Sequence, residues 1–435
     1  MSSRQISVDH LTRVEGEGGL QVVVEDGQVT DVRLHIFEPP RLFEAFLVGR
    51  SYEELPDLTA RVCGICPTPY QMSATQAAEN AFGASIDEQV RRLRRLALCG
   101  EWISSHCLSI FLLAAPDFLG YSDAFAMAKD HPEVVRRGLF LKRLGNDLSA
   151  LIGGREIHPV SACVGGFHRV PTMAELATLV DRLEQGKQEA RETVQWTASL
   201  PLPELALDRE YVALSHPDEY GMDRGRVVSN KGLDIGVSEF LDHIEEKQVP
   251  YSTALHASIK GRGAYCTGPL ARVNLNFDRL TPDAQEAARA SGVPFPNDNP
   301  FTSIVARAIE VLHAVDEAGQ IVAQYRRPAP FVPVPPRAGT GHGLTEAPRG
   351  ALYHRYTFDE EGMILDARLV PPTAQNQRQI EDDLRAFAPR TTTLPPEEAA
   401  RRCATVVRNY DPCISCSAHV VRARKREWGN GSVGV

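Results

Sequence analysis

Two short cysteine pairs, almost a chain length apart, carry the strongest chemical signal in the sequence. Cys63 and Cys66 form the first pair, and Cys413 and Cys416 form the second. Two residues separate the cysteines of each pair, a spacing that lets both thiolates bind one metal ion. Because 346 residues (67–412) lie between the pairs, a single four-sulfur site has to be assembled by the fold.

The spacing leaves open which metal such a site would hold. Cys-x-x-Cys pairs are typical of structural zinc, which takes four thiolates in a closed tetrahedral shell. Zinc modules usually keep their pairs within roughly 15–20 residues of each other, and here the interval is far larger. Zinc is still not excluded, because the cost of closing a loop grows slowly with its length. Thiolates also suit nickel and iron; spacing alone favours zinc by a small margin.

The composition limits the class of protein and its partners. The chain has 435 residues, 43% of them hydrophobic and 24% charged, as in ordinary globular proteins. A net charge of -9 argues against a nucleic-acid partner. No stretch approaches the roughly 20 apolar residues of a membrane span, and the N-terminus lacks a signal-peptide core. Nine cysteines, an odd number, favour free thiols and a cytoplasmic location.

The pattern of apolar residues predicts one α+β body, mainly helical, with a central bundle of long helices and small peripheral antiparallel sheets. An N-terminal sheet turns at Asp26-Gly27, and a second hairpin at 350–370 turns at 359–362. Strand-like pieces lie at 227–229 and 271–275, and the proline-rich stretch 327–336 is expected to be irregular. Helices are predicted at 41–47, 70–82, 86–114, 134–152, 173–198, 237–247, 281–291, 303–325, 377–388 and 396–407.

Further short motifs follow one another along nearly the whole chain. They are Asp9–Gly16, Pro40–Glu44, Arg61–Cys66, Gly153–Pro159, Glu346–Gly350, Pro371–Asn376 and Asp411–His419. In this order they resemble the large, catalytic subunit of NiFe hydrogenases, and the two cysteine motifs together are highly specific. The ending DPCISCSAH and the motif PPTAQN are most similar to the soluble, cytoplasmic multi-subunit enzymes that exchange electrons with NAD(P), including the sulfhydrogenase type.

The resemblance implies a nickel ion bound by all four paired cysteines. Cys66 and Cys416 would also bridge to an iron, while Cys63 and Cys413 would be terminal nickel ligands. The iron would carry carbon monoxide and two cyanides, which no amino acid supplies, so a maturation protease and nickel-insertion proteins are implied as partners. Bridging thiolates bring the two metals close, so hydrogen would be split between a metal and a basic sulfur.

By the same resemblance, Glu15 and Arg349 are the catalytic candidates. Glu15 would relay protons from a terminal cysteine; from the residues alone it is a carboxylate satisfying backbone donors in a glycine turn. Arg349 would hold its guanidinium over the open nickel–iron position, although an arginine between proline and glycine is usually a turn residue. Thr373 would donate its hydroxyl to a cyanide, and Pro348 and Pro372 would shape the pocket.

Glu44 and His419 match ligands of a buried magnesium-type ion. A carboxylate suits magnesium and an imidazole suits iron or zinc, so the resemblance leaves magnesium and iron open. Without the resemblance, Glu44 would be a solvent-facing helix residue and His419 a neighbour of the cysteine pair. Tyr70 stands where many members have a histidine. Its hydroxyl can hydrogen-bond a thiolate but cannot act as an imidazole base.

Weaker matches concern the partner side and the remaining cysteines. Arg155 and His158 would lie toward the nearest iron–sulfur cluster of a partner subunit. His106 is either similar to a family residue or a histidine that packs helices together. The other cysteines are expected to be small buried apolar residues: Cys99, Cys107, Cys163, Cys266 and Cys403.

Residues 1–419 are expected to form a single catalytic domain. It comprises the N-terminal sheet at about 5–36, a helical core at about 41–325, and a C-terminal hairpin and metal-site segment at about 341–419. Residues 420–435 would be a maturation peptide that is removed after His419; the alternative is a permanent basic tail.

Electron transfer requires partners, because the chain has no further cysteine set for an iron–sulfur cluster. It also lacks a strand-linked G-x-G-x-x-G motif for a dinucleotide. A small iron–sulfur subunit and flavin- and NAD(P)-binding diaphorase-type subunits are therefore expected. The leading hypothesis is reversible oxidation of H2 with electrons passed to NAD(P), with sulfur or polysulfide as a further acceptor. The alternatives are an F420- or ferredoxin-linked hydrogenase, a non-catalytic H2 sensor, and a complex-I-like subunit, against which the four intact cysteines count.

Overall fold

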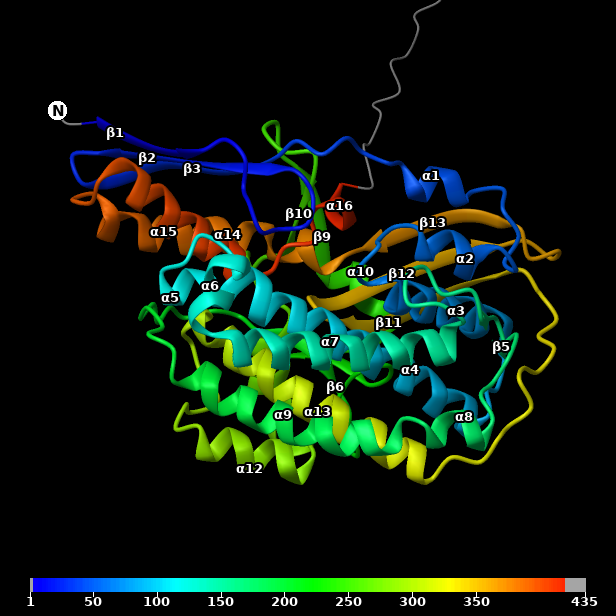
Figure 1. The fold of residues 1–435 in the computed structure, drawn as a ribbon. Helices are drawn as coiled ribbons and strands as arrows, with labels where there is room; N and C mark the ends of the chain where they lie inside the picture. The colour runs from blue at the N-terminus through cyan, green and yellow to red at the C-terminus, as the bar shows by residue number, and fades with distance from the viewer. Residues whose placement is uncertain (1–2, 419–435) are drawn as a thin grey trace, which may run out of the picture.

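The computed structural model of the chain describes residues 3–418, whose fold is drawn in Figure 1. A π-helical segment, η1 (Leu108–Ala114), joins two of the helices into one continuous rod. The α-helices are α1 (Phe43–Leu47), α2 (Leu55–Ala60), α3 (Pro67–Phe82), α4 (Glu88–Cys107), α5 (Ala115–Leu119), α6 (Ala124–Asp130), α7 (Pro132–Gly153), α8 (Met173–Ala177), α9 (Val180–Ala198), α10 (Phe240–His243), α11 (Pro269–Asn276), α12 (Pro282–Ala290), α13 (Ser303–Ala323), α14 (Pro372–Phe387), α15 (Pro396–Asn409) and α16 (Ile414–Ser417).

The strands of the described residues form small antiparallel sheets, each with its strands in sequence order. The three-stranded sheets are β1 (Ser3–Val8), β2 (Gly18–Glu25) and β3 (Gln28–Ile36); β6 (Val212–Ser215), β7 (Arg226–Ser229) and β8 (Asp234–Ile235); and β11 (Gly339–Ala347), β12 (Gly350–Phe358) and β13 (Ile364–Val370). The two-stranded sheets pair β4 (Ala162–Cys163) with β5 (Gly166–Phe167) and β9 (Ile244–Gln248) with β10 (Leu255–Ile259).

Long helices form the centre of the molecule, with α4, α7, α9 and α13 side by side in Figure 1. Glycine lets two of them approach closely: a Cβ on Gly145 of α7 would lie 2.4 Å from the backbone oxygen of Gly100 on α4. Contrary to the expectation that no stretch is long and apolar enough, the rod Glu88–Leu119 could cross a membrane by length and composition alone, but 78% of its most apolar window is buried inside the structure. That burial is the behaviour of a core helix.

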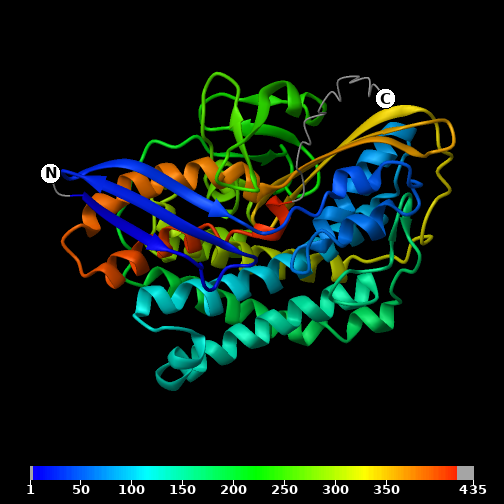
Figure 2. The ribbon, with the colours of Figure 1, turned by 90° about the horizontal axis from the view of Figure 1, so that it is seen from above.

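The sheet β11–β13 packs directly on α3, which begins beside the first cysteine pair. Glycines make this contact possible, since a Cβ on Gly341 would lie 1.9 Å from the Ala77 backbone oxygen on α3. Figure 2 shows the short helix α16 between the N-terminal sheet and helices α2 and α3. The fold therefore brings segments from both ends of the chain to one place.

The predicted fold class, a mainly helical α+β body with small antiparallel sheets, is confirmed. The Asp26-Gly27 turn joins β2 to β3, and both residues have the positive φ (48° and 80°) that a tight hairpin turn requires. The second hairpin is also present, as β12 and β13. The sequence reading missed its third strand, β11.

Two element predictions are wrong. The stretch 271–275 lies in helix α11 instead of a strand, because Pro269 starts a helix and Arg272 and Asn276, one turn apart, both find buried partners. The stretch 237–247 is helical only to His243 and then becomes strand β9, which pairs with the buried strand β10. In both cases tertiary pairing overrides the local pattern. The division into a domain at 1–419 and a peptide at 420–435 stays a prediction, since His419 and 420–435 lie outside the described residues.

Candidate metal centre

Each cysteine pair lies at the start of a helix, and the second cysteine of the C-terminal pair is inside its helix, α16. Cys66 is the N-cap of α3 and is followed by Pro67, whose fixed φ suits the first helical position. Cys413 is the N-cap of α16. Both pairs thus place a cysteine at the N-cap of a helix.

The four sulfur atoms come together at a single buried point, with every Sγ within 4.8 Å of the others. Cys63 Sγ lies 3.3 Å from Cys413 Sγ, Cys66 Sγ lies 3.7 Å from Cys416 Sγ, and the two sulfurs of the second pair are 2.9 Å apart. None of the four residues is more than 3% exposed. The predicted meeting of the chain ends at one site is therefore present.

Four buried sulfurs this close together favour a bound cation, because ionised thiolates repel one another. Burial opposes ionisation of Cys63, but hydrogen bonding from the other three thiols and the Arg349 charge set its pKa well below the ordinary value. The backbone N–H groups of Ile65 and Cys66 also donate to its sulfur, each at 3.2 Å. The pKa of Cys413 is raised well above the ordinary value by its sulfur neighbours and by burial. Four sulfurs at this spacing become thiolates together only when a metal ion balances their charge.

Glu15 lies beside the second cysteine pair, although the two are almost 400 residues apart in the chain. Its backbone forms a parallel bridge with Cys413, and the Ile414 N–H donates to its carbonyl at 2.9 Å. Its carboxylate Oε2 lies 3.2 Å from Cys413 Sγ and accepts from the Ser415 N–H at 3.1 Å. The Ser415 hydroxyl donates to the other carboxylate oxygen. Glu15 thus satisfies a backbone donor and also contacts a cluster thiol, and its role as a proton relay stays a prediction.

Arg349 sits in the tight turn between β11 and β12, yet its side chain is buried and faces inward. It donates to the Asp411 carbonyl at 2.7 Å, to the Asp411 carboxylate at 3.0 Å and to the Ser105 hydroxyl at 3.2 Å. Burial lowers the pKa of Arg349, but Asp411 and then the sulfurs of Cys413, Cys66 and Cys63 raise it well above the ordinary value. Its permanent charge therefore acts on the sulfur cluster.

Thr373 also lies next to the cluster. It stands in the first turn of α14, a helix that begins five residues earlier than predicted. Its hydroxyl oxygen accepts from the Cys413 N–H at 3.0 Å. Pro372 is the first residue of the same helix and is buried. Pro348 directly precedes Arg349 in the β11–β12 turn. The structure thus gathers all three pocket residues around the segments that carry Cys413 and Arg349.

Glu44 lies on α1 against strand β13, and its side chain is only 14% exposed. One carboxylate oxygen accepts from the Leu369 N–H at 2.8 Å, and the other pairs with Arg368 at 3.3 Å. The solvent-facing alternative is therefore wrong for this residue. Its predicted co-ligand His419 lies outside the described residues.

The residues with weaker matches fall in different places. His106 is completely buried, with Nε2 3.0 Å from Glu310 Oε2, so it joins helices α4 and α13. His158 lies at the surface side of the first cysteine turn, where its Nδ1 is 2.8 Å from the Ala60 carbonyl oxygen. Arg155 donates to the His158 carbonyl at 2.6 Å. Tyr70 is buried beside the cluster, where burial and the Cys416 thiolate raise the pKa of its hydroxyl.

The expectation for the remaining cysteines is met at four positions. Cys99, Cys107, Cys266 and Cys403 are buried, whereas Cys163 is partly exposed. Burial raises the pKa of Cys163 to about 11 and that of Cys266 to about 12, so these thiols stay protonated near neutral pH.

Sequence reasoning missed the contribution of one face of helix α4. Glu101 accepts from the Thr68 N–H at 2.7 Å in the first turn of α3, and Ser105, one turn later, contacts Arg349. The role of Asp411 was also missed: it holds Arg349 from a backbone φ of 52°, uncommon outside glycine. The available sequence signal was the i, i+4 spacing of Glu101 and Ser105, which places these two polar side chains on one face of the helix, next to His106 in the sequence.

Comparison with known proteins places this arrangement in a class. The family model described as nickel-dependent hydrogenase matches residues 41–136. The chain is 35% identical over 421 residues to sulfhydrogenase 2 subunit alpha of Pyrococcus furiosus, with 96% of this chain and 99% of the relative covered. It is 33% identical over 428 residues to sulfhydrogenase 1 subunit alpha of the same organism, with 96% and 98% covered. The chain therefore belongs to the nickel-dependent hydrogenase family, as a catalytic large subunit.

A solved structure is similar to this chain over almost its whole length. The fold matches the crystal structure of an NAD+-reducing [NiFe]-hydrogenase in its H2-reduced state with a TM-score of 0.85 and 28% identity, covering 96% of this chain and 99% of that one. The buried four-cysteine cluster is the donor set that fits the nickel of this family. The resemblance seen in the motifs is thereby confirmed.

Proposed function

We propose that this subunit catalyses the reversible oxidation of H2 to protons and electrons at a nickel–iron centre. All four cysteines would hold the nickel, Cys63 and Cys413 as terminal ligands, while Cys66 and Cys416 would be shared with an iron that would carry carbon monoxide and two cyanides. The observation that carries the proposal is the buried set of four sulfurs with a carboxylate 3.2 Å from Cys413 Sγ. When bound, the two metals supply the polarisation of H–H and the sink for its electrons.

In this proposal Cys413 and Glu15 handle the proton. A proton on the Cys413 sulfur passes to Glu15 Oε2 directly, since the two atoms are within hydrogen-bond reach at 3.2 Å. The Ser415 N–H and hydroxyl hold the carboxylate toward the sulfur. Glu15 is partly exposed, so the proton continues from there toward the surface.

Arg349 and Thr373 would hold the non-protein ligands of the iron. The buried Arg349 guanidinium supplies a fixed positive charge beside the thiolates. The Thr373 hydroxyl accepts from the Cys413 N–H, which leaves its own hydrogen to donate to a cyanide. Pro348 and Pro372 line the same pocket without contributing backbone N–H groups.

Glu44 and His419 would hold the third ion, magnesium or iron. The Ala418 carbonyl accepts from the Arg41 N–H at 3.0 Å, so the residue before His419 lies next to the segment that carries Glu44. Removal of 420–435 after His419 then completes the domain 1–419. A carboxylate and an imidazole together leave the choice between the two ions open.

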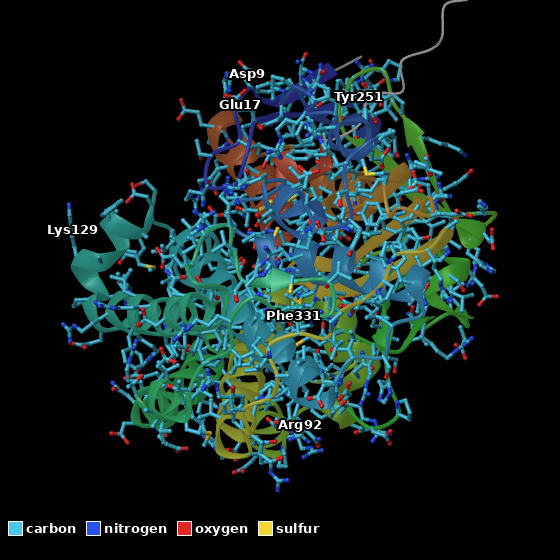
Figure 3. The ribbon with its side chains drawn as sticks, turned by 90° about the vertical axis from the view of Figure 1, so that its right-hand side faces the viewer. Asp9, Glu17, Arg92, Lys129, Tyr251 and Phe331 are labelled. Atoms are coloured by element: carbon cyan, nitrogen blue, oxygen red, sulfur yellow. The ribbon has the colours of Figure 1, made fainter. Side chains whose placement is uncertain are left out.

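An iron–sulfur partner docks on the face next to the first cysteine turn. Ile157, Val160 and Phe331 are large apolar side chains that are 51%, 42% and 48% exposed, and Figure 3 views this side with Phe331 near its middle. Phe331 also lines a groove of about 610 Å³, together with Cys163, His168 and 332–336. His158 connects this face to Ala60, three residues before Cys63. Exposed apolar surface of this kind favours a subunit interface.

NAD(P) is the proposed electron acceptor, reached through flavin-containing diaphorase-type subunits in the cytoplasm. The likeness to an NAD+-reducing [NiFe]-hydrogenase over 96% of the chain supports this choice. The relatives named sulfhydrogenase support sulfur or polysulfide as a second acceptor.

The complex purified through a tag on this subunit should reduce NAD(P) with H2 and contain iron–sulfur protein. Phe331→Glu should lose that partner and the NAD(P) activity but retain nickel, because a buried charge opposes docking. Leu365→Glu is the matched control, since Leu365 is 56% exposed on β13. Reduction of F420 or ferredoxin alone would contradict the acceptor, and absence of any turnover with intact metals would favour a sensor.

Elemental analysis with infrared spectroscopy tests the centre itself. The purified subunit should contain nickel and iron, and its spectrum should show carbon monoxide and cyanide stretching bands that vanish when the metals are removed. Cys403→Ser, at a buried cysteine that is not part of the four-sulfur cluster, should leave both results unchanged. One equivalent of zinc without these bands would overturn the proposal.

A further inference from the structure

Arg272 on helix α11 is a fully buried arginine whose five N–H groups are all bound. Its side chain has no exposed surface. The guanidinium donates to Glu310 Oε1 at 2.7 Å and Oε2 at 2.6 Å, and to Glu346 Oε2 at 3.0 Å. The remaining bonds go to the carbonyl oxygens of Ala347 at 2.8 Å and Pro348 at 3.1 Å.

The two carbonyls belong to the residues immediately before Arg349. Trp102 holds the carbonyl one position earlier, as its indole N–H donates to the Glu346 backbone oxygen at 2.9 Å. The Arg272 guanidinium also stacks 4.2 Å from the centre of the Trp102 ring. Three consecutive carbonyls at the end of β11 are thus fixed by side chains from α4 and α11.

The pairing stays ionised near neutral pH. Burial would raise the pKa of Glu310, but the Arg272 charge and hydrogen bonds, together with His106, lower it to about 2. Burial lowers the pKa of His106 to about 4, so this histidine is neutral and leaves Arg272 as the cation of the group. A fixed charge pair inside a dry core keeps one geometry because any displacement leaves buried charge unpaired.

We propose that Arg272 is a positioning residue that fixes the Arg349 turn over the sulfur cluster. Arg349 itself is bound by Ser105 and Asp411 at its far end, and Arg272 fixes the backbone from which it starts. A lysine cannot replace it, because one ammonium group cannot span two carboxylates and two carbonyls as a planar fork does. The inference rests on the proposed function only in taking Arg349 to face the metals.

Arg272→Lys in the holoenzyme tests this role, with Arg95→Lys as the matched control. Arg95 is an equally buried arginine held by Glu317 at 2.6 Å, Asp223 at 2.8 Å and the Tyr220 carbonyl at 3.3 Å. We expect Arg272→Lys to retain nickel while kcat falls by roughly tenfold to a hundredfold, as for a displaced catalytic group. The cyanide bands should shift, and amide hydrogen exchange across 346–350 should rise. Arg95→Lys should lower Tm without either spectroscopic change.

Equal behaviour of the two variants would overturn the proposal. If Arg272→Lys does not fold, Trp102→Phe tests the proposal instead, because it removes one of the three hydrogen bonds to the carbonyls and keeps an aromatic ring. Trp102→Phe should shift the cyanide bands and raise the amide hydrogen exchange of 346–350 in the same direction as Arg272→Lys, but by a smaller amount. If neither quantity changes, the proposal is wrong. A wild-type protein without nickel or cyanide bands would instead refute the proposed function, while the exchange of 346–350 still reports whether Arg272 holds the turn.

Discussion

Replacing Cys416 by serine is expected to abolish assembly of the metal centre. Cys416 Sγ lies 2.9 Å from Cys413 Sγ and 3.7 Å from Cys66 Sγ, so it joins the two pairs into one donor set. A serine hydroxyl is a harder donor and does not ionise near neutral pH, so it does not replace a bridging thiolate. Nickel and iron should be absent from the purified variant, and H2 oxidation should be undetectable.

The same variant reports on the fate of the C-terminal segment. If removal of 420–435 requires a loaded centre, the Cys416→Ser protein should keep these residues, and intact mass should show the full chain. Cys403→Ser is the control, because Cys403 is equally buried and has the Thr391 hydroxyl 4.0 Å away to pair with the new side chain. Full nickel and iron in Cys416→Ser, or wild-type protein that is active while still ending at Val435, would contradict these expectations.

The cluster could be predicted from the sequence because its four ligands lie in two short local motifs. Each Cys-x-x-Cys pair lies at the start of a helix, so the residues next to it in the sequence carry the information. The same holds for Glu15, whose glycine-rich surroundings allow its backbone to pair with Cys413: a Cβ on Gly16 would lie 2.7 Å from the Ile414 side chain. Local signals of this kind survive without knowledge of the fold.

The support around the cluster could not be predicted in the same way. Arg349 reads as a turn residue from sequence, and it does lie in a turn; its role depends on Asp411 and Ser105, which come from distant segments. Arg272 was assigned to a strand, because no local pattern reveals two buried carboxylates and two carbonyls around it. Long-range hydrogen bonds decide these positions, and they exist only once the chain has folded.

The remaining large effect concerns Glu15→Gln, which should slow H2 turnover while leaving the metals in place. Glutamine has the shape of glutamate and still pairs with the Ser415 N–H and hydroxyl, so the local geometry is kept. It cannot carry a proton from Cys413, and loss of a positioned acid–base group typically costs roughly 10²–10⁴-fold in rate. Hydrogen uptake measures the turnover rate, and the nickel content and infrared bands of the same preparation show whether the metals are retained.

Glu17→Gln separates the proton role from a general effect of charge. Glu17 lies in the same glycine-rich turn but is exposed, and the bond given by its backbone N–H, 3.0 Å to Glu38, survives the change. This variant should turn over like the wild type. The carboxylate at 15 matters because it combines contact with a cluster sulfur and partial exposure, so it joins the buried site to the surface in one step. Wild-type turnover in Glu15→Gln would remove that link and require another proton acceptor at Cys413.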